Sequence, residues 1–155
     1  MSLKIYYQNS SSVYVEVTED DDITDPVHTI HDGKNGDVKT TALYLHNDGS
    51  SALWYSNIII EPYDLVDGDT YDDTSYLDTG WGVKLSQGGT EPTETEWNDI
   101  EWGAEISMSN IGSDSLADVA TYYPFWYLIT CPPNTNAQNK RDIVLRIKYT
   151  ENAVT

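Results

Sequence analysis

The residues best suited to chemistry are the aspartates of one short acidic stretch. Calcium prefers oxygen ligands, and acidic turns supply them. Five carboxylates fall within ten positions: Asp64, Asp67, Asp69, Asp72 and Asp73. The spacing is not that of an EF-hand, because Gly68 comes too early and the closing glutamate is absent. The stretch is a candidate calcium site, and a solvated acidic loop is the alternative.

Catalytic chemistry has no comparable set of residues. The single cysteine, Cys131, ends an apolar aromatic run, whereas a reactive thiol needs a histidine and a polar setting. The three histidines, at positions 28, 31 and 46, lack close metal-ligand spacing. The carboxylate pair of a glycosidase is defined by distance in space, so the many acids single out no pair. We expect a protein that is not an enzyme and has no cofactor, with calcium as the one candidate.

The charge balance excludes two classes of partner. The 155-residue chain has 26 acidic and 8 basic residues, a formal net charge of -18. Nucleic acids and anionic membranes both attract basic surfaces, so we expect neither as a partner. No apolar run approaches the roughly 20 residues of a membrane span. The first residues lack a secretory signal pattern, and one cysteine allows no internal disulfide.

The elements that must position these residues are strands. Apolar and polar residues alternate with a period of two, which is typical of antiparallel sheets with one buried face. Such runs occur at 13–18, 41–46, 57–61, 104–109 and 143–149. Ile58 and Ile60 are expected to face away from Asn57, Ile59 and Glu61.

Turn residues separate these runs. Clusters rich in Asp, Asn, Gly and Pro follow several of them, and the sequence Asn47-Asp48-Gly49 predicts a hairpin. Helix is scarce; residues 113–119 are expected to form one short turn or a loop. The pattern predicts a single all-β domain over residues 1–155, an antiparallel β-sandwich of about 7–9 strands. Immunoglobulin-like and jelly-roll topologies both remain open.

The aromatic composition favours docking surfaces. Five Trp and twelve Tyr accompany a single Phe, and such amphipathic rings are favoured in strands, interfaces and sugar-binding platforms. Four of the eight basic residues fall within the last sixteen positions, where they either dock an acidic neighbour or protect an edge strand. The candidate interface residues are Tyr6, Tyr7, Trp54, Trp97, Trp102, Arg141, Arg146 and Lys148.

The N-terminal segment allows two interpretations. Leu3, Ile5 and Tyr7 alternate like a strand. Within residues 1–12, this strand is either an arm that adds to a neighbour's sheet or the first strand of its own sheet. We favour the second interpretation.

Several stretches, taken in order, resemble the strand pattern of tailed-virus particle proteins. They are Ala42–Leu53 followed by Tyr55–Ile60, then Trp81–Ser86, then Phe125–Thr135, then Asp142–Tyr149. The resemblance implies a capsid decoration or turret protein, or a tail or baseplate part, in a bacteriophage or archaeal virus. It implies residence in the virion after assembly in the host cytoplasm, contact with a major capsid or tail protein, and a homo-oligomer such as a trimer.

The leading hypothesis is a structural virion component that binds through aromatic-rich surfaces. The alternative is a carbohydrate-binding β-sandwich module, with calcium as a potential aid and a glycan as partner. In that case Trp54, Trp81, Trp97 or Trp102 would stack on sugar rings.

Overall fold

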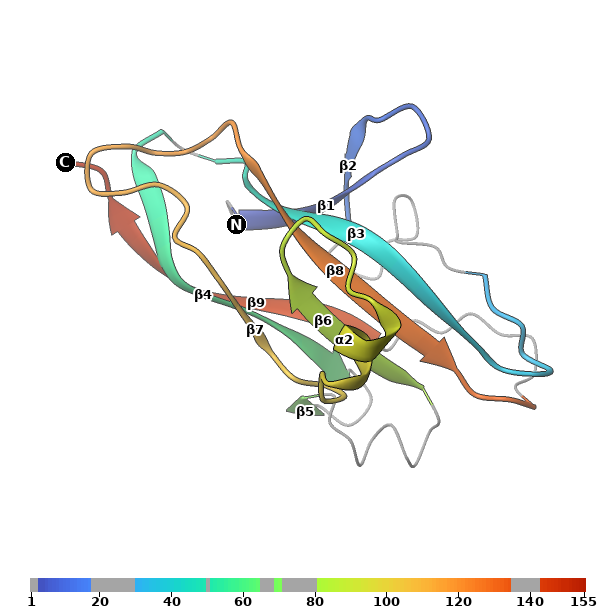
Figure 1. Ribbon diagram of the computed structural model, residues 1–155. Helices are drawn as coiled ribbons and strands as arrows, with labels where there is room; N and C mark the ends of the chain where they lie inside the picture. Colours follow the sequence, from blue (N-terminus) through green and yellow to red (C-terminus); the bar gives the residue numbers. More distant parts are fainter. Residues whose placement is uncertain (1–2, 18–29, 50, 65–68, 71–80, 135–142) are drawn as a thin grey trace.

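The protein is an all-β sandwich, as the sequence predicts. The computed structural model describes residues 3–17, 30–49, 51–64, 69–70, 81–134 and 143–155. These residues form nine strands and one short helix, and every strand pair is antiparallel. Figure 1 shows the strands as two layers, with helix α2 (Glu94–Asn98) beside the first layer.

The first sheet has five strands in the order β2-β1-β3-β8-β6. Their bounds are β1 Leu3–Gln8, β2 Tyr14–Glu16, β3 Asp37–Asn47, β8 Tyr122–Cys131 and β6 Gly82–Gln87. The longest ladder of this sheet joins β3 to β8, from Asp37 opposite Cys131 to His46 opposite Tyr122. β1 pairs with both β2 and β3, so Leu3–Gln8 is a strand of its own sheet.

The second sheet is built around the long strand β4 (Leu53–Asp64). Ile60 is paired with Ile147 of β9 (Ile143–Ala153) and with Ile106 of β7 (Ile106–Met108). A strand has only two edges, so β9 and β7 lie on opposite edges of β4. The two-residue strand β5 (Asp69–Thr70) pairs with the end of β4.

A β-bulge interrupts β4 between Ser56 and Ile59. Asn57 has a φ of 51°, a left-handed conformation that Asn tolerates better than most residues. The extra residue changes which positions face inward: Tyr55 is buried before the bulge, and Ile58 and Ile60 are buried after it. The expected orientation of the two isoleucines is confirmed, and the bulge is what produces it.

The core lies between the two sheets. Its first-sheet members include Leu3, Leu43, Leu45, Val83, Leu85 and Phe125, and its second-sheet members include Tyr55, Ile58, Ile60 and Met108. Ile111, which bridges to Tyr55 from the loop after β7, completes the cluster. Each contributing strand presents alternate residues inward, which leaves the intervening side chains on the outer faces.

One local prediction was wrong and another is confirmed. Residues 47–49 do not form a hairpin, because β3 and β4 belong to different sheets. The Asn47 side chain instead accepts a hydrogen bond from the Gly49 backbone N (3.1 Å) in a turn that carries the chain between the layers. The expectation of a short turn or loop at residues 113–119 is confirmed: Ser113 and Leu116 pair across a tight turn, and the helix in the described part of the chain lies earlier, at α2.

Candidate docking face

The outer side of the first sheet carries a cluster of aromatic side chains. Leu43, Leu45 and Phe125 point into the core, so the residues that alternate with them along β3 and β8 point outward. The same alternation applies to β1 and β2. The resulting aromatic face consists of Tyr6, Tyr14, Tyr44, His46 and Tyr122.

The rings of the aromatic face pack directly on one another. Tyr122 lies parallel to His46 on one side and to Tyr14 on the other, at centroid distances of 3.9 and 3.7 Å. Tyr6 meets Tyr122 edge-on at 5.4 Å, and Tyr44 meets Tyr14 edge-on at 5.0 Å. Pairs of this kind contribute about 0.5–1.5 kcal/mol each. The cluster therefore ties β1, β2, β3 and β8 together outside the core.

Exposure divides the aromatic face into two parts. Tyr6 and His46 are buried at 8% and 7% exposure, which makes them the base of the cluster. Tyr14, Tyr44 and Tyr122 stay half-buried, so part of each ring is open to a partner. The face offers apolar area together with phenol hydroxyls, the combination favoured at interfaces.

Polar contacts fix the rim of the aromatic face. Lys4 lies 3.1 Å from both Asp48 and Glu16, and these contacts raise the pKa of Lys4 and lower that of Asp48. Burial and the nearby Asp48 carboxylate raise the pKa of the Tyr6 hydroxyl. The His46 Nδ1–H donates to the carbonyl oxygen of Thr121 (2.9 Å). The rim is thus ordered, and its lysine is neutralised locally.

A second part of the same outer side is an acidic segment. The chain leaves β6 and passes Pro124 at Gly89, then places Glu91 within 2.6 Å of the Thr40 hydroxyl of β3. Helix α2 follows, started by a capping box between Thr93 and Glu96. The acidic cover is defined by its exposed carboxylates: Glu91, Glu94, Glu96, Asp99 and Glu101.

The acidic cover is fastened to the sheet by a buried lysine. Lys84, on the outer side of β6, is 6% exposed and donates to the carbonyl oxygen of Trp97 in α2 (2.8 Å). Its ammonium also lies 4.4 Å from the ring centroid of Trp102, a cation–π arrangement. Trp97 is buried, whereas Trp102 remains half-buried.

The predicted interface residues are distributed unevenly. Tyr6 and Trp97 are buried within the chain, and Tyr7 packs against the core side of the sheet. Trp54 is half-buried on the second sheet, away from the aromatic face. Trp102 is half-buried beside the acidic cover. Arg141 lies outside the described residues.

The remaining two, Arg146 and Lys148, are engaged by the chain's own Glu61. The Glu61 side chain is 4% exposed and lies 2.5 Å from Arg146 and 3.2 Å from Lys148. Burial by itself would raise the pKa of Glu61, but hydrogen bonds from the two cations outweigh it and hold the pKa below its ordinary value. The predicted basic docking patch is therefore partly neutralised by a carboxylate on the neighbouring strand.

The calcium prediction falls largely outside the described residues. Asp67, Asp72 and Asp73 are not described, and of Asp64 and Asp69 the structure gives only their backbone pairing across β4 and β5. Within the described residues, no three His, Cys, Asp or Glu side chains converge in a way that could hold a metal ion.

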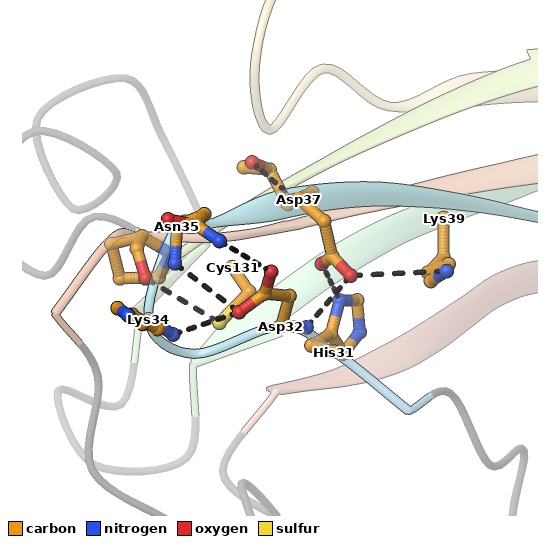
Figure 2. Close-up of polar contacts among 9 residues, drawn as sticks. His31, Asp32, Lys34, Asn35, Asp37, Lys39 and Cys131 are labelled. Atoms are coloured by element: carbon orange, nitrogen blue, oxygen red, sulfur yellow. Dashed lines mark hydrogen bonds and ion pairs between the residues drawn. The ribbon is translucent and has the colours of Figure 1, made fainter.

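A polar cluster also fastens the loop before β3, as Figure 2 shows. The Asp32 carboxylate accepts hydrogen bonds from the backbone N of Lys34 and of Asn35 (3.0 and 3.2 Å). The Asp37 carboxylate accepts one from His31 (2.5 Å). Cys131, opposite Asp37 in the ladder, is 3% exposed, and its thiol donates to the Pro132 carbonyl (3.5 Å). These contacts hold a turn in place.

Comparisons with known proteins found no match for this chain. The chain matches no protein-family model, no curated protein and no solved structure. Among the described helices, none is long and apolar enough to cross a membrane.

Proposed function

We propose that the protein is a non-enzymatic structural component of a virus particle that attaches to another particle protein through the outer side of its first sheet. The observation that carries the proposal is the aromatic face. Tyr14, Tyr44 and Tyr122 stay only half-buried on a sandwich whose core is already filled by other residues. Interfaces are anchored by tyrosines of this kind within a polar rim.

The order of strand motifs supports the viral part of the proposal. The described parts of the stretches that resemble tailed-virus particle proteins overlap β3, β4, β6, β8 and β9. Such a subunit works by binding energy alone, in the tail or on the capsid shell, and forms a homo-oligomer such as a trimer.

The test is quantitative mass spectrometry of purified virus particles from cells that carry this gene. The proposal expects the chain in a fixed ratio to the major shell or tail protein. Its absence from intact particles would contradict the proposal.

A carbohydrate-binding module is the second candidate, and one observation favours it. Trp126 on the outer side of β8 is half-buried and has small residues on both neighbouring strands, Ala42 on β3 and Ser86 on β6. Trp81 and Trp97, by contrast, are buried and unavailable for stacking. A glycan array with and without calcium tests this candidate. Saturable sugar binding by an isolated monomer, lost in Trp126→Ala and kept in Val38→Ala, would favour it over the first.

A further inference from the structure

The outer side of the first sheet combines two features that together describe a partner. The aromatic face and the acidic cover adjoin where Gly89 passes Pro124, which is paired with Tyr44. Half-buried tyrosine rings therefore lie next to a run of exposed carboxylates.

Among the described residues, the carboxylates of the acidic cover form no ion pair. Within the described residues, no Lys or Arg lies within ion-pair distance of Glu91, Glu94, Glu96, Asp99 or Glu101. Five like charges within eleven positions repel one another, and a docked cationic surface would relieve that repulsion.

Most of the described lysine and arginine side chains form ion pairs with other carboxylates of the chain or are buried. Lys4 pairs with Glu16 and Asp48, and Lys39 approaches Asp37. Arg146 and Lys148 pair with Glu61, and Lys84 is buried beneath the cover. Among the described cations only Lys34 is exposed and in no ion pair, so the described part of a second copy supplies little of the positive charge that this surface lacks.

We propose that the aromatic face and the acidic cover form one docking surface for a basic protein segment, rich in arginine or lysine. Tyr44, which has no ring stacked on it among the described residues, offers its π system to the partner's cations, and the carboxylates of the cover pair with them. The inference rests on the proposed function, because it names the chemistry of the partner at the face described above. It excludes an acidic partner at this surface.

The test uses the full chain and a blocked polyarginine peptide, with polyglutamate of equal length as the reversed-charge probe. Amide NMR shifts locate binding, and calorimetry in low and moderate salt gives the Kd. We expect polyarginine to shift residues of β3, β8 and α2, and polyglutamate to leave them unchanged. Shifts centred on other elements would overturn the inference.

Charge variants distinguish binding at the acidic cover from attraction of the peptide by the net negative charge of the whole chain. Glu94→Gln/Glu101→Gln removes two carboxylates of the cover, and Asp114→Asn/Glu151→Gln removes two exposed carboxylates elsewhere. The first should weaken the Kd for polyarginine by about 2- to 10-fold more than the second. Equal losses in the two variants would show that net charge alone attracts the peptide.

Ring variants test the aromatic half of the surface. Tyr44→Leu should weaken binding by about 2- to 5-fold, whereas Tyr44→Phe should retain it, because phenylalanine keeps the π face. Equal affinity of Tyr44→Leu and the wild type would show that the rings take no part in binding.

If peptide binding fails while the chain is still found in particles, only the partner's chemistry is refuted. If the peptide maps to this surface and particles lack the chain, the viral function is refuted.

Discussion

At the scale of single residues, Glu61 shows how a position on the outer face becomes buried. It sits directly opposite Arg146 across the β4–β9 ladder, with Lys148 beside it. The guanidinium of Arg146 in turn lies 4.4 Å from the ring centroid of Tyr63. One carboxylate thus organises two cations and an aromatic ring, a role that alternation alone does not reveal.

Removal of the Glu61 carboxylate should lower stability in a pH-dependent way. The folded state holds the Glu61 pKa below its ordinary value of 4.5, so its contribution is present above that pH and is lost as pH falls through the folded-state pKa. We expect Glu61→Gln to lower the free energy of unfolding by about 1–3 kcal/mol at neutral pH, with a smaller difference near pH 3. Urea unfolding at both pH values measures this. A difference that is constant with pH would show that the charge is unimportant.

Cys131 should behave as an inert thiol. It is 3% exposed at the end of β8, so a thiol reagent can reach the sulfur only when the end of the strand opens. We expect Ellman's reagent to react slowly with the native chain and rapidly in denaturant. Native reactivity equal to that of a free thiol would contradict the burial of this residue.

At the scale of elements, the sequence predicts the strands better than their partners. The alternation at 41–46 and 143–149 falls within β3 and β9, because one face of each strand is buried. The connection at 47–49 was misread because turn residues specify a reversal and not which sheet receives the next strand. The bulge at Asn57 was missed because a single inserted residue leaves the apolar run intact.

The candidate docking face was only partly predictable. The aromatic bias predicted docking, but the predicted Tyr6 and Trp97 are buried, and the three half-buried rings of Tyr14, Tyr44 and Tyr122 were not singled out. Tyr14 and Tyr44 stand at the polar positions of alternating runs, and that was the available signal for them. Helix α2 also had a signal, the Thr93-to-Glu96 capping box, but five residues are too few for helical periodicity.

Replacing Gly112, in the loop that follows β7, by alanine should destabilise the fold more than the same change at Gly88. Its φ is 88°, and an added Cβ would lie 2.5 Å from the Leu116 carbonyl oxygen and 2.8 Å from Trp54 Cβ. Gly88 also has a positive φ, 113°, but nothing within 4 Å of an added Cβ. We expect Gly88→Ala to cost about 1–2 kcal/mol from backbone strain, and Gly112→Ala about 1–3 kcal/mol more from the clash. Thermal unfolding measures both; equal losses would show that the clash is relieved.

At the scale of the whole molecule, charge sets how copies of the chain meet. A net charge of -18 makes copies repel one another in low salt. Screening shortens the range of this repulsion from about 10 Å at 0.1 M salt to about 3 Å at 1 M. We therefore expect light scattering to show a mass near 17.4 kDa in low salt and a small closed oligomer in molar salt. A mass that falls as salt rises would contradict this, because it would mean that ion pairs hold the copies together.

We propose that the protein attaches to a particle through the outer side of its first sheet. The most direct test of this proposal is the number of copies per purified particle, measured by mass spectrometry for the wild type, Tyr44→Ser and Val38→Ser. Val38 is a matched control because it is 54% exposed on the same strand and the same outer side, six positions from Tyr44. We expect Tyr44→Ser, shown to be folded by circular dichroism, to be depleted from particles while Val38→Ser is retained. Equal occupancy of both variants, or particles without the chain, would contradict it.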